Sequence, residues 1–459
     1  MADRVVLERF IASRPLAVMT RIVLDEMLSE EEIQQVFKDA RGRNYQRDMA
    51  FNSLCDAIAD VILEFCPSPN QAYLDHKESL AVSRTAFYNK LKNVDVRLSR
   101  KLVQYSYQKS RKMLEQLKVP RWSYLTGYNT KIIDGNSIAA CENRLLELRL
   151  TWQKALPAKS VVVMDADWQL IQDIQLLEDG QAQERTVLGA IVETVRPRDL
   201  FLIDSSFCTI EFMSGIDRRD ACFIVRHHGK LQGELLGQRR FCGRSETGKV
   251  YEQSIRVGGP QGLIYRRVTV ELKEPTVDGD TVIHILTNLP PDKADAILVA
   301  KLYLYRWEIE HKFYVATVAM RCEIQSLNYP RAHLFVFCMS MLALNCRQVL
   351  FGALYQAFGE EIESEASHQS VSLEITRSMD GLLTAFDETH WKRLLPETFE
   401  GRMDMLVEVA GHYDRTRHRK SVRGPKHPPP KKSRYRNGHH LSVKKILDER
   451  KRNAKLKTC

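Results

Sequence analysis

The sequence predicts an α/β core with a mixed β-sheet, preceded by an all-α region. From about Thr130 the chain contains short runs that are apolar at consecutive positions, a pattern typical of strands buried on both faces. Three such runs are residues 131–134, 160–165 and 200–204, and residues 184–195 between the last two have helical character. Strands that alternate with a helix favour an α/β fold. Before Thr130, apolar residues recur at helical spacing instead.

The first 120 residues are expected to form a helical DNA-binding domain with a candidate helix-turn-helix at residues 80–91. Ser83 is the expected cap of the second helix. The residues expected to face outward as a DNA reader are Arg84, Asn89, Lys90 and Lys92. A helix-turn-helix offers the first turn of its second helix to a DNA groove. The alternative is an ordinary helical hairpin, since this pattern also arises by chance.

Charge is unevenly distributed along the chain. Of the formal net charge of +10, residues 411–459 hold 17 Lys/Arg against 3 Asp/Glu, and the rest of the chain is slightly acidic. A second basic region, residues 71–121, holds 12 Lys/Arg against 4 Asp/Glu. Both regions are candidate polyanion contacts, with a solvated surface or a solubility tail as the alternative.

The sequence predicts a cytoplasmic protein without a membrane anchor. Residues 1–14 carry charges of both signs, unlike an export signal. Residues 333–346 are strongly apolar but shorter than the ~20 residues of a spanning helix, which predicts a buried helix. The ten cysteines include no Cys-x-x-Cys pair, which argues against a zinc ribbon and for reduced thiols.

Strand-like runs at residues 222–227, 250–257, 263–272 and 281–287, separated by turns, predict a β-rich insertion at residues 221–289. One long helix is expected over residues 293–321, a second over 332–357, and an acidic loop over 359–375. The expected organisation is therefore the helical domain (1–120), an α/β core in two parts (121–220 and 290–358) around the insertion, a C-terminal helical region (359–422) and a basic, flexible tail (423–459).

Three carboxylates stand out as candidate metal ligands. Asp134 and Asp204 each follow a buried apolar run, and ligand sites in open α/β sheets lie at such strand ends. Glu310 shares a helical stripe with Tyr303 and Arg306. Carboxylates from two strands and a helix fit a two-metal phosphodiester site, because Mg²⁺ takes oxygen ligands.

Plainer roles remain open for these carboxylates at this point. Asp134 could lie in a turn, Asp204 could cap a helix, and Glu310 could form an ordinary surface ion pair with Arg306. Asp165 also follows a strand, so spacing alone leaves it as a further candidate.

Four motifs occur in the order seen in one family. They are Ile132-Ile-Asp134-Gly, Leu202-Ile-Asp204-Ser-Ser-Phe207, Thr287-Asn-Leu-Pro290 and Tyr303-x-x-Arg306-Trp307-x-Ile-Glu310. Over roughly residues 120–350 the chain resembles the insertion-sequence four family of DDE transposases. The resemblance implies a ribonuclease-H-like fold with a β-rich insertion, and catalysis by Asp134, Asp204 and Glu310 with two Mg²⁺ ions, for which Mn²⁺ can substitute. It also implies DNA contacts by Tyr303 and Arg306 and by Trp307, whose alternative is a core aromatic.

The chain departs from the family pattern at several positions. Ser205-Ser206 follows the second Asp where relatives have Arg-Gly, and Thr317 and Tyr314 stand where relatives carry basic residues. Lys312 is expected on the opposite helix face. Arg321 returns to the face of Glu310, which suggests that it contacts phosphate in place of the missing lysine, with a helix-end Arg complementing the dipole as the alternative.

The resemblance implies a DNA transposase that cleaves transposon ends through a hairpin and transfers them into target DNA. Expected partners are double-stranded DNA, as terminal inverted repeats and target, and a second copy in a homodimeric synaptic complex. If the source is prokaryotic, the protein is expected at the nucleoid. The alternatives are a catalytically impaired DNA-binding protein derived from a transposase, and a non-transposing nuclease of the same fold.

Overall fold

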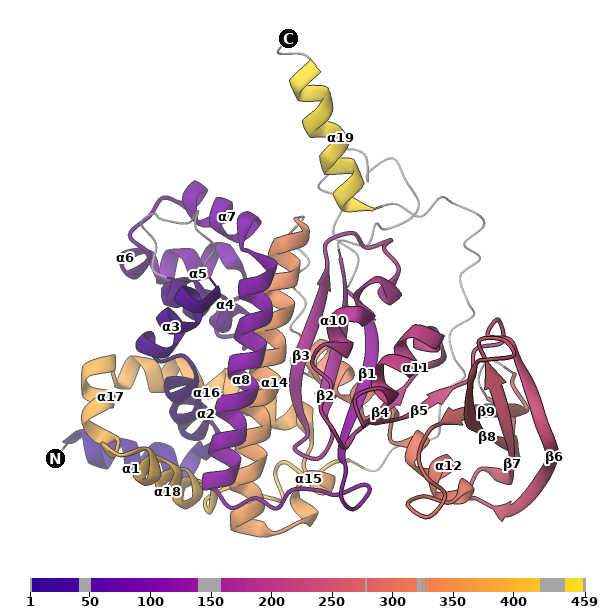
Figure 1. The fold of residues 1–459 in the computed structure, drawn as a ribbon. Helices are drawn as coiled ribbons and strands as arrows, with labels where there is room; N and C mark the ends of the chain where they lie inside the picture. The colour runs from indigo at the N-terminus through magenta and orange to yellow at the C-terminus, as the bar shows by residue number, and fades with distance from the viewer. Residues whose placement is uncertain are drawn as a thin grey trace.

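A computed structural model describes residues 2–40, 51–138, 158–276, 279–319, 324, 327, 329–421 and 442–456. A nine-stranded sheet carries a group of helices on one side, separated from it by the two long helices α8 (Val96–Gln116) and α14 (Pro330–Phe358) (Figure 1). The predicted α/β class with a preceding all-α region is confirmed.

The sheet has the strand order β3-β2-β1-β4-β5-β9-β8-β7-β6. Its strands are β1 (Asn129–Ser137), β2 (Lys159–Asp165), β3 (Leu170–Leu177), β4 (Asp199–Ile203), β5 (Cys222–Arg226), β6 (Gly233–Arg244), β7 (Gly248–Val257), β8 (Leu263–Leu272) and β9 (Val282–Thr287). Strands β1 to β3 are antiparallel, whereas β4 and β5 run parallel to β1. This order and these directions are those of a ribonuclease-H-like sheet.

The β-rich insertion extends this sheet. Strand β9 pairs with β5, with Ile224 opposite Thr287, and β8, β7 and β6 follow as an antiparallel meander. One face of the meander packs against α12 (Ala296–Leu304). The helix that follows the insertion is therefore anchored on the insertion itself.

Alternate residues of the central strands enter two separate cores, as the period of a strand requires. Ile132 and Leu202 belong to the core shared with the helices α8 and α14. Ile133 and Ile203 face the other core, which is completed by α10 (Leu188–Val192) and α11 (Ile210–Asp217). The sheet is thus covered on both faces, which explains its near-continuous apolar runs.

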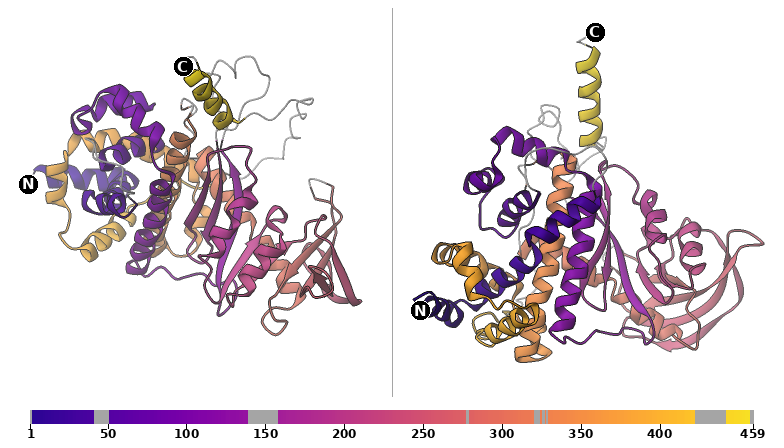
Figure 2. Two further views of the ribbon diagram at one scale, coloured as in Figure 1. Left: turned by 45° about the horizontal axis from the view of Figure 1, so that its top comes forward. Right: turned by 60° about the vertical axis from the view of Figure 1, so that its left-hand side comes forward.

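Helices from both ends of the chain make up the helical side (Figure 2). The N-terminal ones are α1 (Ala2–Ser13), α2 (Pro15–Met27), α3 (Glu30–Ala40), α4 (Phe51–Ile62), α5 (Pro69–Asp75), α6 (Lys77–Leu80) and α7 (Arg84–Asn93). The C-terminal ones are α15 (Glu361–Glu365), α16 (His368–Ala385), α17 (Glu388–Leu394) and α18 (Phe399–Ala410), and α19 (Val443–Leu456) follows later. Helix α2 packs against both α16 and α18, so the two ends of the chain share one core.

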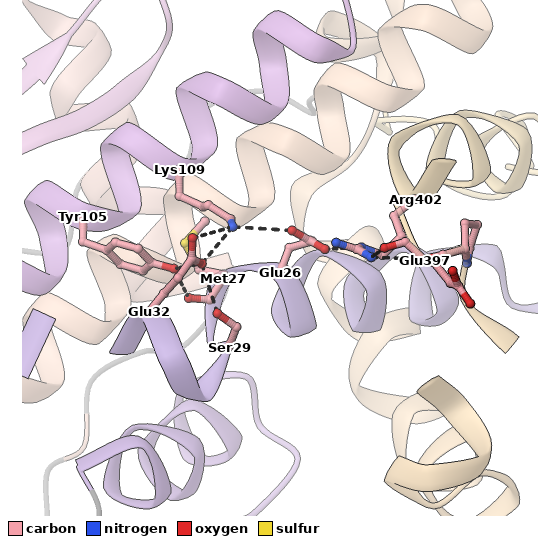
Figure 3. A network of polar contacts seen from close by, with 9 residues as sticks. Glu26, Met27, Ser29, Glu32, Tyr105, Lys109, Glu397 and Arg402 are labelled. Carbon is pink, nitrogen blue, oxygen red and sulfur yellow. Dashed lines mark hydrogen bonds and ion pairs between the residues drawn. The ribbon is translucent and has the colours of Figure 1, made fainter. Parts of the chain in front are cut away.

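A network of polar contacts ties these ends to α8 (Figure 3). The Lys109 ammonium contacts Glu26 at 3.5 Å and Glu32 at 2.8 Å. Tyr105 donates a hydrogen bond to Glu32 at 2.7 Å, and Arg402 of α18 pairs with Glu26. Lys109 and Glu26 are almost fully buried, so each charge depends on its partners.

Helix α14 is long and apolar enough to cross a membrane, with a mean hydropathy of 1.7 over its most apolar window. However, 94% of that window is buried inside the protein, beneath α8, α4 and α2. Its apolar surface is therefore used as core, in agreement with the buried helix predicted for residues 333–346.

Two predictions about helices were wrong. The single helix expected over residues 293–321 is divided into α12, α13 (Trp307–Tyr314) and a π-helical turn (Val315–Ala319). At the break between α12 and α13, Tyr305 and Arg306 donate their backbone N–H groups three residues back. The acidic loop expected at 359–375 contains α15 and the start of α16, which Ser367 caps through a hydrogen bond from Ser370 N.

Candidate active site

Asp134 and Asp204 lie side by side on one face of the sheet. Ile132 pairs with Leu202, and Ile133 with Ile203, in the parallel ladder between β1 and β4. Asp134 directly follows Ile133, and Asp204 directly follows Ile203. Because side chains alternate along a strand, both aspartates project to the face of Ile132 and Leu202. Asp204 directly follows β4, as predicted. The prediction that Asp134 ends its strand was wrong, because β1 continues to Ser137 through pairing with β2.

Arg306 and Glu310 come from the start and middle of α13, which packs against β1. The break before α13 places Arg306 at the N-cap position, where its side chain is only 8% exposed. Glu310 lies one turn later, and its side chain is 38% exposed. The helix thus delivers a buried cation and a half-exposed carboxylate to the two aspartates.

The guanidinium of Arg306 joins all three carboxylates. One terminal nitrogen lies 3.2 Å from Asp134 Oδ2 and 2.9 Å from Glu310 Oε1. Its Nε lies 4.0 Å from Asp204 Oδ1. The predicted site residues Asp134, Asp204, Glu310 and Arg306 are therefore brought together, and the ion pair between Arg306 and Glu310 is part of a larger cluster.

The two aspartates differ in their electrostatic surroundings. Burial raises the pKa of Asp134 to about 6, against the opposing effects of Arg306 and of the Gly135 N–H donated to it at 2.8 Å. Burial also opposes ionisation of Asp204, but the N–H of Ser206, Arg306 and the N–H of Ser205 together hold its pKa below the usual range. Asp204 also caps the short 3₁₀ turn Ser205–Phe207, so both of its predicted roles are compatible.

Two aromatic residues flank the cluster. Tyr303 is buried, and burial, partly offset by Arg306, raises the pKa of its hydroxyl to about 12. Trp307 is 58% exposed, with its ring 5.1 Å from the Arg306 guanidinium. The alternative assignment of Trp307 as a core aromatic was wrong. Tyr314, about two turns after Trp307 on the same helix, is also exposed, at 56%.

The donor set suits a hard divalent cation. Three carboxylates offer only oxygen ligands, which Mg²⁺ and Mn²⁺ accept. Each has an oxygen within 4.0 Å of the same guanidinium, so all three already surround one positive charge. Within the part of the chain that the structure describes, no three acidic, His or Cys side chains are close enough together to hold a metal ion. The three carboxylates therefore offer the oxygen atoms that a divalent metal ion needs, but in this structure they are arranged around Arg306.

Asp165 is the last residue of β2, three residue pairs from Asp134 along the ladder between β1 and β2. Strand β2 is antiparallel to β1, so Asp165 pairs with Lys131, whereas Asp134 pairs with Val162. Asp165 accepts a hydrogen bond from Tyr107 at 2.7 Å and one from the N–H of Asp167 at 3.1 Å. It joins α8 to the sheet and is not part of the cluster.

The residues at the expected lysine positions are non-basic where the structure describes them. The hydroxyl of Thr317 donates to Phe313 O at 2.9 Å within its own helix. Lys312 lies on the other side of α13, where it donates to Gln348 Oε1 at 2.9 Å, as its spacing predicted. Arg321 lies outside the described residues, so its proposed phosphate contact stays a prediction.

The candidate DNA reader has the expected local structure. Helices α6 and α7 are joined by a turn in which Ala81 adopts a left-handed conformation with φ 50°. Ser83 caps α7 by accepting the N–H of Ala86 at 3.2 Å, as predicted. Arg84 and Asn89 are exposed. Lys90 and Lys92 are half-buried, and Lys92 stacks on Tyr329 at 4.2 Å.

One functional contact was missed by the sequence reasoning. Glu308, on the other side of α13 from Glu310, accepts hydrogen bonds from Tyr124 at 2.8 Å and Gln169 at 2.7 Å. These contacts fix the rotation of the helix that carries Glu310. In the sequence, Glu308 is visible only as a carboxylate two residues before Glu310. No local pattern connects it to Tyr124 or Gln169, so its contacts could not be predicted.

Residues 125–346 match the family model of the transposase DDE domain. The matched segment contains all three carboxylates and Arg306. The chain is also similar to a cryo-EM structure of a piggyBac transposase synaptic complex with hairpin DNA, with 10% identity, a TM-score of 0.39, and coverage of 91% of this chain and 88% of that chain. No curated protein matches the sequence. The matched domain supports a transposase of the DDE class, an enzyme that cuts and joins DNA.

Proposed function

We propose that the chain is a DNA transposase that cleaves transposon ends and joins them to target DNA. The observation that carries the proposal is the convergence of Asp134, Asp204 and Glu310 on Arg306 within the segment that matches the transposase DDE domain. Double-stranded DNA, as terminal inverted repeats and as target, is the proposed substrate.

Each residue has a proposed role that follows from its position. Asp134, Asp204 and Glu310 hold two divalent metal ions, Mg²⁺ or Mn²⁺, which when bound supply activation of the attacking oxygen and stabilisation of the leaving oxygen. Arg306 keeps the carboxylates in place and moves toward the phosphate as the substrate arrives. The exposed indole of Trp307 stacks on a base beside the scissile phosphate.

Further steps of the proposal come from the family resemblance. End cleavage proceeds through a DNA hairpin, followed by strand transfer, in a synaptic complex of two copies. Tyr303 assists Arg306 from the buried side. The candidate helix-turn-helix lies outside the segment that resembles the family, and we propose from its own pattern that Arg84, Asn89, Lys90 and Lys92 read the end DNA. Such an enzyme acts inside the cell, on the nucleoid if the source is prokaryotic.

The test is cleavage of DNA that carries the inverted repeats flanking the coding region. Purified protein is incubated with this DNA over a Mg²⁺ series, and denaturing gels separate nicks, hairpins and joined products. We expect metal-dependent nicking at the repeat boundary followed by joined products. Nicks without joining would instead indicate a nuclease of the same fold.

A second candidate is a DNA-binding protein derived from a transposase with impaired catalysis. It is favoured by Thr317, whose hydroxyl is engaged within its own helix where relatives carry lysine. End binding without metal-dependent nicking would support it. Restored nicking in Thr317→Lys would show that the lost lysine is the cause.

A further inference from the structure

Helix α13 borders a pocket on the side away from Glu310. This pocket has a volume of about 170 Å³ and lies between α13, α14, α15 and α16. Five basic or imidazole side chains line it, namely His311, Lys312, Arg347, His368 and Lys420. Neither the transposase proposal nor the cluster around Arg306 uses these residues.

Lys312 places an incompletely satisfied ammonium in the wall of this pocket. Its Nζ donates one hydrogen bond, to Gln348 Oε1 at 2.9 Å, although an ammonium has three N–H donors. Among the described residues, no carboxylate lies within ion-pair distance of Lys312. A half-buried cation in this state gains from an anion that accepts its remaining donors.

The pKa of His368 indicates that the electrostatic potential around it is positive. Burial first, and then Arg347, Lys312, His311 and Lys420, lower the pKa of its imidazole to about 2. All of the charged groups that act most strongly on it are therefore basic. Its Nδ1 lies 3.1 Å from a guanidinium nitrogen of Arg347, so the neutral ring accepts a hydrogen bond there.

Two carboxylates also line the pocket, and they leave it positive. Glu308 accepts hydrogen bonds from two uncharged donors, the Tyr124 hydroxyl at 2.8 Å and the Gln169 amide at 2.7 Å. Burial lowers the pKa of Lys312 and outweighs the charges of Glu363 and Glu308, which raise it. The backbone carbonyl of Glu363 accepts a hydrogen bond from Lys420 at 3.2 Å. Lys312, Arg347 and Lys420 together outnumber these two acids.

We propose that this pocket binds a phosphate group through Lys312 and Arg347. Its volume is several times the roughly 30 Å³ that a water molecule occupies in the liquid, which leaves room for one tetrahedral oxyanion with water. His311 and Lys420 are exposed, so the pocket opens to solvent at these residues. The phosphate comes either from free inorganic phosphate or from a DNA phosphodiester.

A bound phosphate would join α13 to α14 and α16. Lys312 belongs to the helix that carries Glu310, whereas Arg347 is held by the hydroxyl of Ser372 at 3.1 Å and by His368. An anion between the two basic side chains therefore fixes the position of α13 from the side opposite the carboxylate cluster. This role differs from phosphate contact at the site of cleavage.

The test measures binding and requires no cleavage. Thermal unfolding of the full chain is followed in inorganic phosphate and in chloride at equal ionic strength, for the parent and for Lys312→Met. Ligand that binds only the folded state raises the melting temperature. We expect phosphate to stabilise the parent and to bind Lys312→Met roughly tenfold more weakly. Lys101→Met, which removes an exposed charge on α8, is the matched control and should resemble the parent.

A second arm distinguishes the two sources of phosphate. Affinity for a short DNA duplex is measured for the same proteins, with inorganic phosphate as competitor. Weaker duplex binding by Lys312→Met but not by Lys101→Met identifies DNA as the source, and stabilisation by inorganic phosphate alone identifies the free ion. If Lys312→Met does not fold, Lys420→Gln at the exposed mouth takes its place.

The proposal is overturned if phosphate stabilises the parent no more than chloride and Lys312→Met binds the duplex like the parent. The same experiment can be run in a Glu310→Gln background. The phosphate test measures melting temperature and duplex affinity, whereas the transposase proposal is tested by nicking. Failure of one proposal can therefore be told apart from failure of the other.

Discussion

Arg306 and Asp134 lie 3.2 Å apart, although 172 residues separate them in the chain. The same guanidinium also meets Glu310 at 2.9 Å. Helix α13 is thus joined electrostatically to β1, the first strand of the core. The acidic cluster is held together by a side chain that is itself a candidate phosphate ligand.

Glu310→Gln is expected to abolish metal-dependent nicking while leaving the affinity for end DNA nearly unchanged. The substitution removes a metal-binding charge, and α7 is far from it in the sequence and in a different layer of the fold. Nicking gels and duplex binding are measured on the same preparation. Asp134→Asn and Asp204→Asn should behave alike, and substantial residual nicking by Glu310→Gln would contradict the assignment.

Asp165→Asn is the matched control for these carboxylates, because Asp165 joins α8 to the sheet through Tyr107. We expect it to lower the free energy of unfolding by about 1–3 kcal/mol, as for a weakened buried hydrogen bond. Nicking per folded molecule should stay at the parental level. A folded Asp165→Asn protein without nicking activity would move the site to the Asp165 end of β2.

Arg306→Met is expected to destabilise the protein by about 3 kcal/mol, because three carboxylates lose the cation that they share. Mg²⁺ should then raise the melting temperature of the variant more than that of the parent, since the ion replaces the guanidinium. Thermal unfolding over a Mg²⁺ series checks this. Equal responses of the two proteins would mean that the three carboxylates do not form a cation site.

Arg84→Ala and Asn89→Ala should reduce the preference for end DNA over random DNA. Both side chains are exposed on the capped helix α7, where base edges can be reached. Lys101→Ala is the comparison, because it removes an exposed charge on α8, outside the candidate reader, and is expected to leave base discrimination unchanged. The ratio of the two dissociation constants is the measured quantity. An unchanged ratio in both variants would exclude α7 as the reader.

The helical side is expected to lose stability as the pH rises from about 4 to about 7. Burial raises the pKa of Asp56 to about 7, with Asp60 adding to the effect and His76 opposing it. The pKa is about 4 in the unfolded chain, so the folded state binds the proton more tightly. This contribution favours folding below pH ~4 and is lost as the pH rises through about 7.

Asp56→Asn tests this linkage. The variant should lose less stability than the parent between pH 4 and pH 7, by an amount of the order of 2 kcal/mol. Urea unfolding at several pH values measures the difference. Asp39→Asn, at an exposed position on α3, should follow the parent curve. Parallel curves for the parent and Asp56→Asn would show that Asp56 ionises normally.

Periodicity in the sequence located the core strands and the two aspartates, because strands buried on both faces are apolar at every position. It missed β6 (Gly233–Arg244), whose side chains are largely exposed, Leu235 and Phe241 among them, so that no buried apolar run marks the strand. The break before α13 was also missed, because no Gly or Pro interrupts the sequence between α12 and α13. Helical spacing did place Glu310 and Arg306 together, and did place Lys312 on the other face.

The contacts that organise the site could not be predicted from local patterns. Arg306 reaches Asp134 only because α12 ends on the insertion sheet and the chain then turns into α13. The same holds for Glu308 with Tyr124, which are 184 residues apart. Pairings at this sequence separation depend on the complete fold and leave no trace in the spacing of neighbouring residues.

The shared core of α2, α16 and α18 has a consequence for synthesis of the protein on the ribosome. Helix α2 leaves the ribosome early, but its partners α16 and α18 are complete only when Ala410 has been translated. The apolar residues of α2 therefore stay exposed while most of the chain is translated. A product truncated after α14 would contain Asp134, Asp204 and Glu310 yet lack half of the packing around α2. Premature termination therefore yields an aggregation-prone fragment instead of a small active nuclease.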